Sequence, residues 1–206
     1  SDEFLNALDG KEDPEDKRRI IGNLFIKVFW DSVGNAEMLA QGTLYPDVIE
    51  SASNAKSKAS VIKTHHNRVP KILELQEQGK VLEPLAELFK DEVRELGAAL
   101  GIASDILGRH PFPGPGLAVR CPGAVDRERL NIIRECDAIF IGKLKQHGWY
   151  DRVWQAYAGL IPVKTVGVKG DERSYEWATN LRAVISEDAM TAEWVDLPAQ
   201  LLRETS

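Results

Sequence analysis

Hydrophobic residues in the first half of the chain alternate between helical and strand-like spacing. Asp13 followed by Pro14 predicts the start of a helix, with the aspartate as N-cap. The apolar positions of this helix are Ile20, Ile21, Leu24, Phe25, Val28 and Phe29. A second amphipathic helix, with Gly101 as its C-cap, is predicted from Leu85, Leu88, Phe89, Val93, Leu96 and Leu100. Short apolar segments at 38–40 and 59–63 are typical of buried strands, so we expect an α/β fold with a parallel sheet.

The second half follows a different pattern. A helix is predicted from about Asp126 to Gln146, with an apolar stripe of Ile132, Ile133, Cys136, Ile139 and Phe140. We expect a shorter helix around 150–157, then a valine-rich strand over 161–169 and an alternating strand over 175–185. Gly170-Asp171-Glu172-Arg173 predicts the turn between the two strands. Helices kept apart from an antiparallel pair indicate an α+β fold for this half. A further helical pattern begins near Leu197.

Between the halves lies the segment His110-Pro111-Phe112-Pro113-Gly114-Pro115-Gly116. Three prolines and two glycines in seven positions predict a stiff, exposed bend that is neither helix nor interior strand. One interpretation is an interdomain linker. The other is a wall for a flat ligand, because proline lacks an amide donor and glycine allows close approach of the backbone.

Composition and charge narrow the class of protein. The 206 residues are 43% hydrophobic and carry a net charge of −6, which offers no bulk positive field for nucleic acid or an anionic membrane. Two cysteines without a CxxC pair indicate neither a disulfide framework nor a cysteine zinc site. No run approaches the ~18 apolar residues of a membrane span, so we expect a soluble protein of the cytoplasm. The start without methionine and the helical pattern at the end suggest a piece of a longer protein.

Polar residues follow both predicted strands, where open α/β sheets bind ligands. After the first strand, Pro46 can start a helix with Asp47 and Glu50 on one face. These acids either complement the helix dipole or accept a hydrogen bond from a ligand or bind Mg²⁺. After the second strand comes Lys63-Thr64-His65-His66-Asn67, which suits a polar loop or a loop that handles phosphate better than a metal site. The charges at 90–94 indicate a solvated helix face unless Lys90 points into a site.

Four motifs together resemble glutamine-hydrolysing GMP synthase. They are Ala-Gln-Gly-Thr-x-Tyr-Pro-Asp-Val-Ile-Glu-Ser at 40–51, Ile-Lys-Thr-His-His-Asn at 62–67, Glu-Pro-Leu-x-Glu-Leu-Phe-Lys-Asp-Glu-Val-Arg at 83–94 and Arg-His-Pro-Phe-Pro-Gly-Pro-Gly-Leu at 109–117. The likeness continues through 155–157, 166–171 and 190–194. It implies that ATP with Mg²⁺ adenylylates the C2 oxygen of XMP, and that ammonia from a glutaminase domain or subunit then displaces AMP to give GMP. It also implies a cytoplasmic homodimer.

The resemblance assigns domains and residues. Residues 1–110 would be the C-terminal part of an ATP-pyrophosphatase domain, with a partial parallel sheet like that of the adenine-nucleotide alpha-hydrolases and a lid loop. Residues 111–206 would be a truncated α+β dimerisation domain. The implied catalytic residues are Lys63, Thr64, His65, His66, Asn67, Glu50, Lys90 and Asp91. The implied XMP-binding residues are Arg18, Asp47, Pro113, Gly114, Pro115, Gly116 and Gln155.

The sequence also departs from the family pattern. The Ser-Gly-Gly-x-Asp-Ser phosphate loop, the amidotransferase domain and the family's terminal segment are absent from this sequence. The stretch 30–37 is also shorter than its counterpart in the family. Either a natural deletion or a sequence spliced across missing residues would produce this difference. We therefore expect this polypeptide not to make GMP alone. Two other interpretations remain: a related ATP pyrophosphatase that activates another carbonyl, and a non-catalytic nucleotide-binding or dimerisation module.

Overall fold

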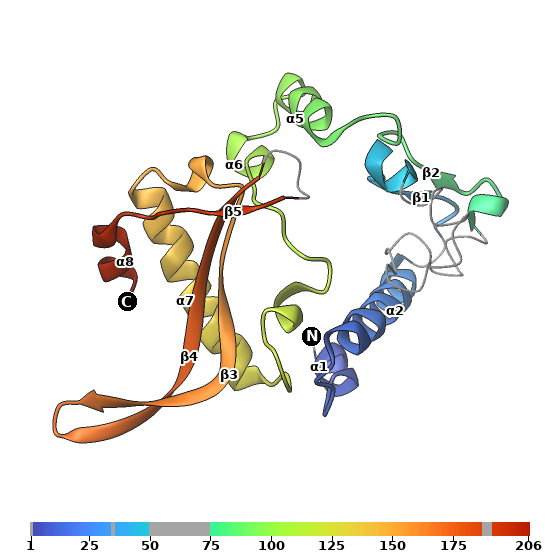
Figure 1. Cartoon of the computed structure of the whole chain (residues 1–206). Helices are drawn as coiled ribbons and strands as arrows, with labels where there is room; N and C mark the ends of the chain where they lie inside the picture. The colour runs from blue at the N-terminus through green and yellow to red at the C-terminus, as the bar shows by residue number, and fades with distance from the viewer. Residues whose placement is uncertain (1, 34–35, 50–74, 187–190) are drawn as a thin grey trace. The chain divides into compact units, whose positions relative to one another are not determined.

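The computed structural model describes residues 2–33, 36–49, 75–186 and 191–206 (Figure 1). The chain forms two compact units, one of 22–109 and one that joins 1–21 to 110–206. The division after Arg109 falls at the start of the proline-rich bend. Among the described residues, no helix is long and apolar enough to cross a membrane.

The 22–109 unit contains a two-stranded parallel sheet. β1 (Leu39–Ala40) pairs with β2 (Val81–Leu82) in the register Leu39 to Val81. The strand expected at 38–40 is therefore confirmed, whereas the one expected at 59–63 lies outside the described residues. Two helices follow, α5 (Lys90–Ala99) and α6 (Ser104–Leu107).

The predicted start of the second amphipathic helix was wrong. Residues 84–87 form turns, and α5 begins only at Lys90, after Phe89 in an extended conformation. The turns are closed by short-range bonds such as Leu88 N–H to the Leu85 carbonyl at 3.0 Å. The Glu92 carboxylate accepts the Phe89 N–H at 2.7 Å, which satisfies a donor that the new helix end leaves open. The predicted C-terminus is confirmed, since Gly101 has φ +78° after the last turn.

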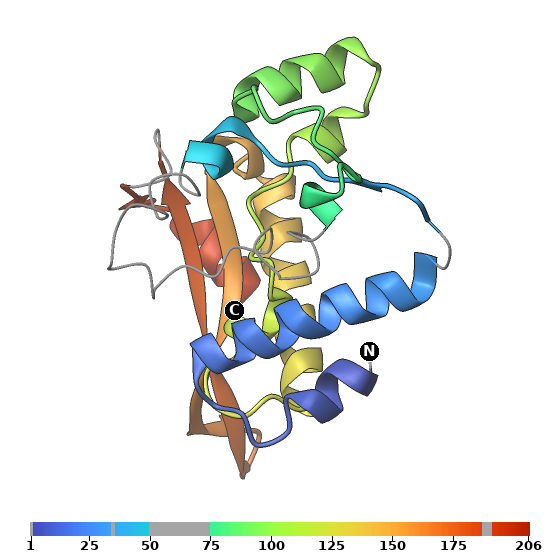
Figure 2. The ribbon, with the colours of Figure 1, turned by 90° about the vertical axis from the view of Figure 1, so that its right-hand side faces the viewer.

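The other unit is built on an antiparallel sheet of order β3-β4-β5. Its strands are β3 (Gln155–Lys169), β4 (Glu172–Ile185) and β5 (Glu193–Trp194). The predicted long helix is α7 (Arg127–Gln146), capped by the Asp126 carboxylate, which accepts the Arg129 N–H at 2.8 Å. α7 lies against the sheet in both Figure 1 and Figure 2, and α8 (Ala199–Thr205) packs on α7. α1 (Asp2–Ala7) and the beginning of α2 (Pro14–Val33) also belong to this unit.

The helix expected around 150–157 was wrong. Only a 3₁₀ turn, η3 (Tyr150–Arg152), precedes β3, which starts six residues earlier than expected. Alternate residues Ala156, Ala158 and Leu160 are buried, and this period of two identifies a strand with one packed face. The predicted turn is confirmed, because Lys169 pairs with Glu172 around Gly170 at φ +66°. The helical pattern near Leu197 is also confirmed, by α8.

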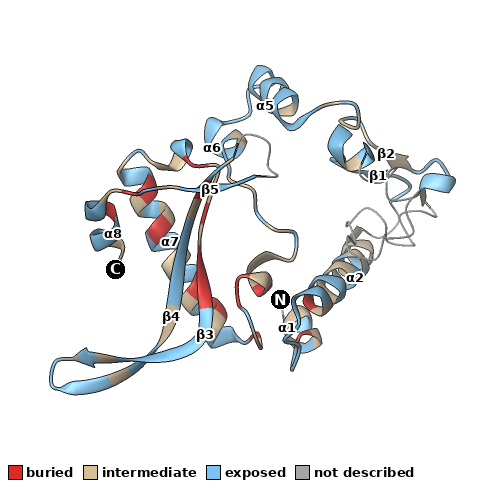
Figure 3. Cartoon of the chain, in the orientation of Figure 1, coloured by how far each residue is buried: buried red, intermediate tan, exposed pale blue. Residues whose placement is uncertain are grey.

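The buried side chains of this unit form two clusters, visible as the red segments of α7 and β3 in Figure 3. The first contains Leu8, Ala118, Cys121, Val125, Leu130, Ile133 and Leu160. The second contains Phe140, Leu144, Val153, Ala156, Leu197 and Leu201. Ile133 and Phe140 of the predicted α7 stripe are buried, but Ile139 is 51% exposed. The fold is thus mixed, with a small parallel sheet in one unit and an antiparallel sheet in the other, as expected at that level.

Candidate functional site

In the 22–109 unit, polar residues gather where the two parallel strands end. The chain continues the ladder past β1, with the Gln41 N–H donating to the Leu82 carbonyl at 2.8 Å. Beyond it, the buried Thr43 hydroxyl donates to the Glu83 carboxylate at 2.6 Å. The loops that leave β1 and β2 are therefore held together at the carboxyl edge, where α/β sheets bind ligands.

Two helix starts meet at this edge. The Tyr45 N–H donates to the Leu88 carbonyl at 3.0 Å, and the rings of Tyr45 and Phe89 make an edge contact with centroids 5.2 Å apart. Tyr45 opens the helical segment 45–49, and Phe89 directly precedes α5. We call this region, with its residues 41–49 and 83–91, the strand-end site.

Asp47, Lys90 and Asp91 all lie on these helix starts. The Asp47 carboxylate accepts the Leu44 N–H at 3.0 Å, so one of its oxygens caps the helix. Lys90 and Asp91 occupy the first turn of α5 and are exposed. Although the residue as a whole is exposed, desolvation of the ammonium lowers the pKa of Lys90, and the charge of Arg94 lowers it further. The structure thus brings Asp47 and Lys90 onto neighbouring segments, whereas Glu50 and 63–67 lie outside the described residues.

The proline-rich bend is anchored to the antiparallel unit through its first residue. The His110 ring stacks on Tyr150 with centroids 3.9 Å apart and an interplanar angle of 10°. Its Nδ1 accepts the Ala156 N–H at 3.1 Å, and its Nε2 lies 2.8 Å from the Tyr150 carbonyl oxygen. Because Nδ1 accepts and a carbonyl cannot donate, the proton must be on Nε2. These contacts therefore fix the position of His110 at the start of the bend.

The rest of the bend is braced as well. The Gln155 carboxamide donates from Nε2 to the Pro111 carbonyl at 2.9 Å. The Gly116 N–H donates to the Pro113 carbonyl at 2.9 Å, and Gly116 has φ +67°, which favours glycine. Phe112 and Gly114 are exposed, and the prolines are half-buried. The expected absence of helix and strand is confirmed for 110–115, whereas Gly116 already begins the short 3₁₀ helix η2 (Gly116–Val119). The expected exposure holds for Phe112 and Gly114 but was wrong for the half-buried prolines.

Sequence reasoning missed the side chain behind the bend. The Arg120 guanidinium lies between the rings of Phe112 and Tyr157, 4.3 and 4.4 Å from their centroids. It also pairs with the Asp137 carboxylate at 3.4 Å, and only 5% of its side chain is exposed. Burial lowers the pKa of Arg120, an effect that Asp137 and Tyr157 oppose. The signal in the sequence was an arginine inside the apolar run 117–121.

A second buried cation lies near the start of α2. The Lys17 ammonium donates to the carbonyls of Ala118, Cys121 and Gly123, at 2.8 Å for Cys121. Arg18, the next residue, points elsewhere: its side chain is 50% exposed and forms an ion pair with Glu15. Arg18 therefore lies on the solvent side of the helix turn that Lys17 anchors.

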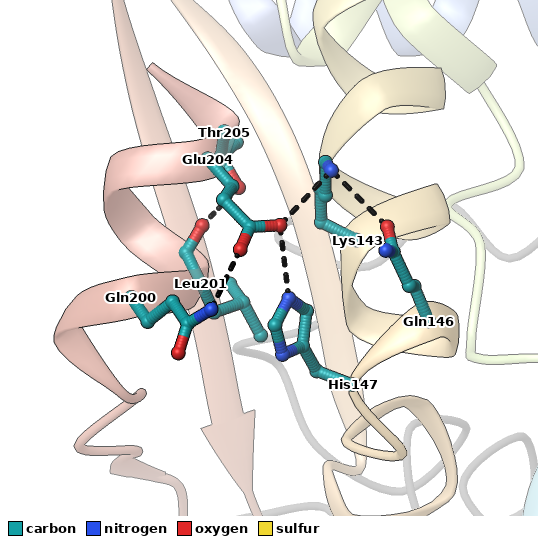
Figure 4. Close-up of polar contacts among 7 residues, drawn as sticks. All are labelled: Lys143, Gln146, His147, Gln200, Leu201, Glu204 and Thr205. Carbon is teal, nitrogen blue, oxygen red and sulfur yellow. Dashed lines mark hydrogen bonds and ion pairs between the residues drawn. The ribbon is translucent and has the colours of Figure 1, made fainter.

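A polar cluster joins the two C-terminal helices (Figure 4). The Glu204 carboxylate of α8 receives bonds from Lys143 of α7 and from His147, the residue that caps α7, both at 3.1 Å, and from Gln200 at 3.0 Å. These donors, His147 first, lower the pKa of Glu204 to about 2. Among the residues that the structure describes, no group of three or more His, Cys, Asp or Glu side chains could hold a metal ion.

Comparison with known proteins gives the family context of these sites. The family described as GMP synthase C terminal domain matches residues 142–206. The GMP synthase [glutamine-hydrolyzing] of Roseobacter denitrificans is 53% identical over 211 residues, which cover 100% of this chain and 40% of its own length. The enzymes of that name from Ruegeria sp. and Bartonella henselae are 53% and 55% identical over 208 residues, or 98% of this chain and 39% of their own lengths.

The chain thus spans about two-fifths of the length of the curated relatives it matches. The motifs quoted above lie between residues 40 and 194, within the part of the chain that these relatives match. The family resemblance is therefore confirmed: this chain is similar to the glutamine-hydrolysing GMP synthases along its whole length, and its residues 142–206 match the family described as GMP synthase C terminal domain.

Proposed function

We propose that the chain is part of an enzyme that makes GMP from XMP. The observation that carries this proposal is the 53% identity to a glutamine-hydrolysing GMP synthase across 100% of the chain. In the first step the C2 oxygen of XMP attacks the α-phosphorus of ATP, and pyrophosphate leaves. In the second step ammonia from glutamine attacks C2, the C2–O bond breaks, AMP leaves with the bonding electrons, and the amine loses a proton.

The need for two steps follows from the chemistry of the xanthine ring. Its C2 oxygen is a poor leaving group, whereas an attached AMP departs as a stabilised phosphate monoester. The protein must therefore bring two nucleotides together, neutralise the charge that develops on pyrophosphate, and exclude water from the adenylylated ring. These demands divide naturally between an ATP site and an XMP site.

We propose that the strand-end site belongs to the ATP half of the reaction. Lys90 would face the departing phosphates, and the helix N-termini at 45–49 and at α5 add partial positive charge. Mg²⁺ would arrive with ATP, because it is usually held by substrate phosphates plus one or two carboxylates. Asp47 and Asp91 offer such oxygens on adjacent segments. Glu50 and the loop of Lys63, Thr64, His65, His66 and Asn67 would complete this half, with the loop as its lid.

We propose that the bend belongs to the XMP half. Pro113, Gly114, Pro115 and Gly116 present a backbone with few donors and little side-chain bulk, which suits the flat face of a purine. Gln155 uses one of its two amide hydrogens on Pro111, so its carboxamide oxygen and its second N–H would be the groups to contact the nucleotide. Arg18 would contribute its exposed guanidinium to the XMP phosphate.

The full assembly is also part of the proposal. Residues 1–110 would be the C-terminal part of the ATP-pyrophosphatase domain, with a sheet like that of the adenine-nucleotide alpha-hydrolases, and 111–206 the dimerisation domain. A glutaminase domain or subunit would supply ammonia, and the enzyme would act as a cytoplasmic homodimer. The exposed side chains of the β3–β4 hairpin, among them Val166 and Tyr175, support an interface between two copies.

The test is nucleotide dependence in the full-length protein that carries this chain. We expect ATP to be cleaved to AMP and pyrophosphate only with XMP, and GMP to form when ammonium or glutamine is added. AMP release that ignores XMP but responds to another acceptor would favour a related ATP pyrophosphatase. No cleavage with any acceptor would favour a non-catalytic module.

A pair of lysine variants tests the strand-end site. Lys90→Met should lower kcat/KM for ATP by about tenfold or more, because a cation near developing charge contributes mostly in the transition state. Lys80→Met is the matched control, since Lys80 is exposed and precedes β2 at the opposite end of the strand. Equal activity of the two variants would show that Lys90 does not take part in the site.

A further inference from the structure

Arg120 connects the bend to α7 and β3. Its guanidinium is stacked between Phe112 of the bend and Tyr157 of β3. It pairs with Asp137 of α7, whose carboxylate also accepts the Ala158 N–H of β3 at 2.8 Å. The Arg120 carbonyl accepts the Leu160 N–H at 3.0 Å. One residue thus contacts helix, sheet and bend.

This arrangement is a poor way to stabilise the fold. The ion pair to Asp137 is long at 3.4 Å, and within the described part of the chain the buried Nε has no hydrogen-bond partner. Replacing both partners of a buried ion pair by apolar side chains of similar volume often leaves stability unchanged or raises it. Apolar residues at both 120 and 137 would therefore serve the core as well as the charged pair does. The planar cation must have another use.

Phe112 indicates what that use is. The ring is 58% exposed, and one face is held against the guanidinium. Its edge lies over Gly116, where a Cβ would come 3.8 Å from Phe112 Cε1. The ring therefore bridges from Arg120 to the end of the bend. A flat guanidinium can stack on an aromatic ring on each of its faces, which an ammonium cannot do.

We propose that Arg120 is a positioning residue: it holds the Phe112 ring, and through it the backbone of 113–116, in the conformation that receives the xanthine nucleotide. The effect on substrate rests on the proposed function, whereas the effect on the bend does not. Arg120 itself touches no reacting atom in this proposal.

Steady-state kinetics of full-length variants test the link to substrate. Arg120→Met preserves volume and should raise KM for XMP by about tenfold, while kcat stays within about twofold, because only binding of the nucleotide is weakened. Arg120→Lys retains the charge but lacks the plane, so KM should stay raised. A normal KM for XMP in either variant would overturn the proposal. Arg134→Met is the control, since Arg134 lies exposed on α7 and donates to Asn131 one turn earlier on the same helix.

A double-mutant cycle tests whether the effect passes through Phe112. Phe112→Leu removes the stacked ring from an exposed position, and it should raise KM for XMP about as much as Arg120→Met. The double variant should be no worse than either single variant, because both remove the same contact. Multiplied effects would show independent roles and overturn the proposal. If Arg120→Met does not fold, Phe112→Leu decides alone, and an unchanged KM would count as the refuting result.

Hydrogen exchange separates this proposal from the proposed function. The amides of Gly116 and Ala156 report on the two ends of the braced bend, through their bonds to Pro113 and His110. In Arg120→Met the Gly116 amide should exchange about tenfold faster, with α7 amides unchanged. An unchanged Gly116 rate would overturn the positioning role even if GMP synthesis were established. If the protein never uses XMP, faster exchange of the Gly116 amide in Arg120→Met would still support the conclusion that Arg120 holds the bend in place.

Discussion

Two buried cations of the antiparallel unit illustrate different reasons for placing a charge in a core. Lys17 is 1% exposed, and its ammonium has three carbonyl acceptors, as many as its donors. Arg120 is nearly as buried, but its Nε has no partner in the described residues. Satisfied donors indicate an anchor, and an incompletely satisfied one indicates a role beyond stability. Lys17 therefore belongs to the fold and Arg120 to the bend.

Removing the Lys17 ammonium should cost much of the stability of this unit. Lys17→Met leaves three carbonyls without their donor, and we expect a loss of about 2–4 kcal/mol in the free energy of unfolding. Urea unfolding of the chain measures it. The control is Lys27→Met on the same helix, where an exposed pair with Asp31 at 3.7 Å should contribute less than about 0.5 kcal/mol. Equal losses of unfolding free energy in the two variants would contradict the role of Lys17 as an anchor of the fold.

Neither cation could be placed from the sequence alone. Helix caps such as Asp13 and Asp126 were predictable, because an aspartate and the amides it accepts lie within three residues. Lys17 and its acceptor Cys121 are 104 positions apart. Nothing local distinguishes Lys17 from the exposed Lys27 of the same helix. The candidate residues Asp47 and Lys90 were likewise chosen from motifs, and only the fold brings their helix starts together.

At the scale of elements, long periodic segments were predictable and short ones were not. The periods of α7 and β4 gave nearly the observed bounds. By contrast, β2 and β5 are two residues long, which is too short for any period to appear. The start of β3 was mistaken for helix because Ala156 and Ala158 have no strand preference of their own; they are held there by pairing with Ala183 and Leu181 of β4.

The contact between α7 and α8 should depend on pH through Glu204. Its pKa is about 2 in the folded chain, below the ordinary 4.5, so the carboxylate contributes stability above pH 4.5. That contribution is lost as the pH falls from 4.5 towards 2. Glu204→Gln should therefore be less stable at neutral pH and should lose stability less steeply over this window. Denaturant unfolding at several pH values measures the slope.

A control for this prediction lies one turn away from the carboxylate. Gln146→Ala removes a 3.1 Å contact to Lys143 but leaves every bond to Glu204 in place. It should retain the acid slope of the parent chain. The role of Glu204 would be refuted if Glu204→Gln kept that slope as well, or if Gln146→Ala lost it.

At the scale of the whole molecule, the hairpin of β3 and β4 carries exposed apolar side chains that the fold leaves uncovered. Val166 and Tyr175 are direct cross-strand partners and are 61% and 60% exposed. Val168, two residues further on the same face, is 80% exposed. Monomers seldom leave such contiguous side chains in water, which supports the proposed pairing of two copies through this face.

The alternation of the hairpin provides its own control for that pairing. Val166→Glu places a charge on the apolar face and should convert the protein to monomers at micromolar concentration, because an unpaired charge is costly to bury. Thr165→Glu adds the same charge one position earlier, on the opposite face of the strand, and should leave the dimer intact. Sedimentation velocity measures the mass of each variant. If both variants dissociated, the added charge itself would explain the loss of the dimer, and the position of that charge on the apolar face would not. If the parent protein were monomeric, this surface would need a different partner.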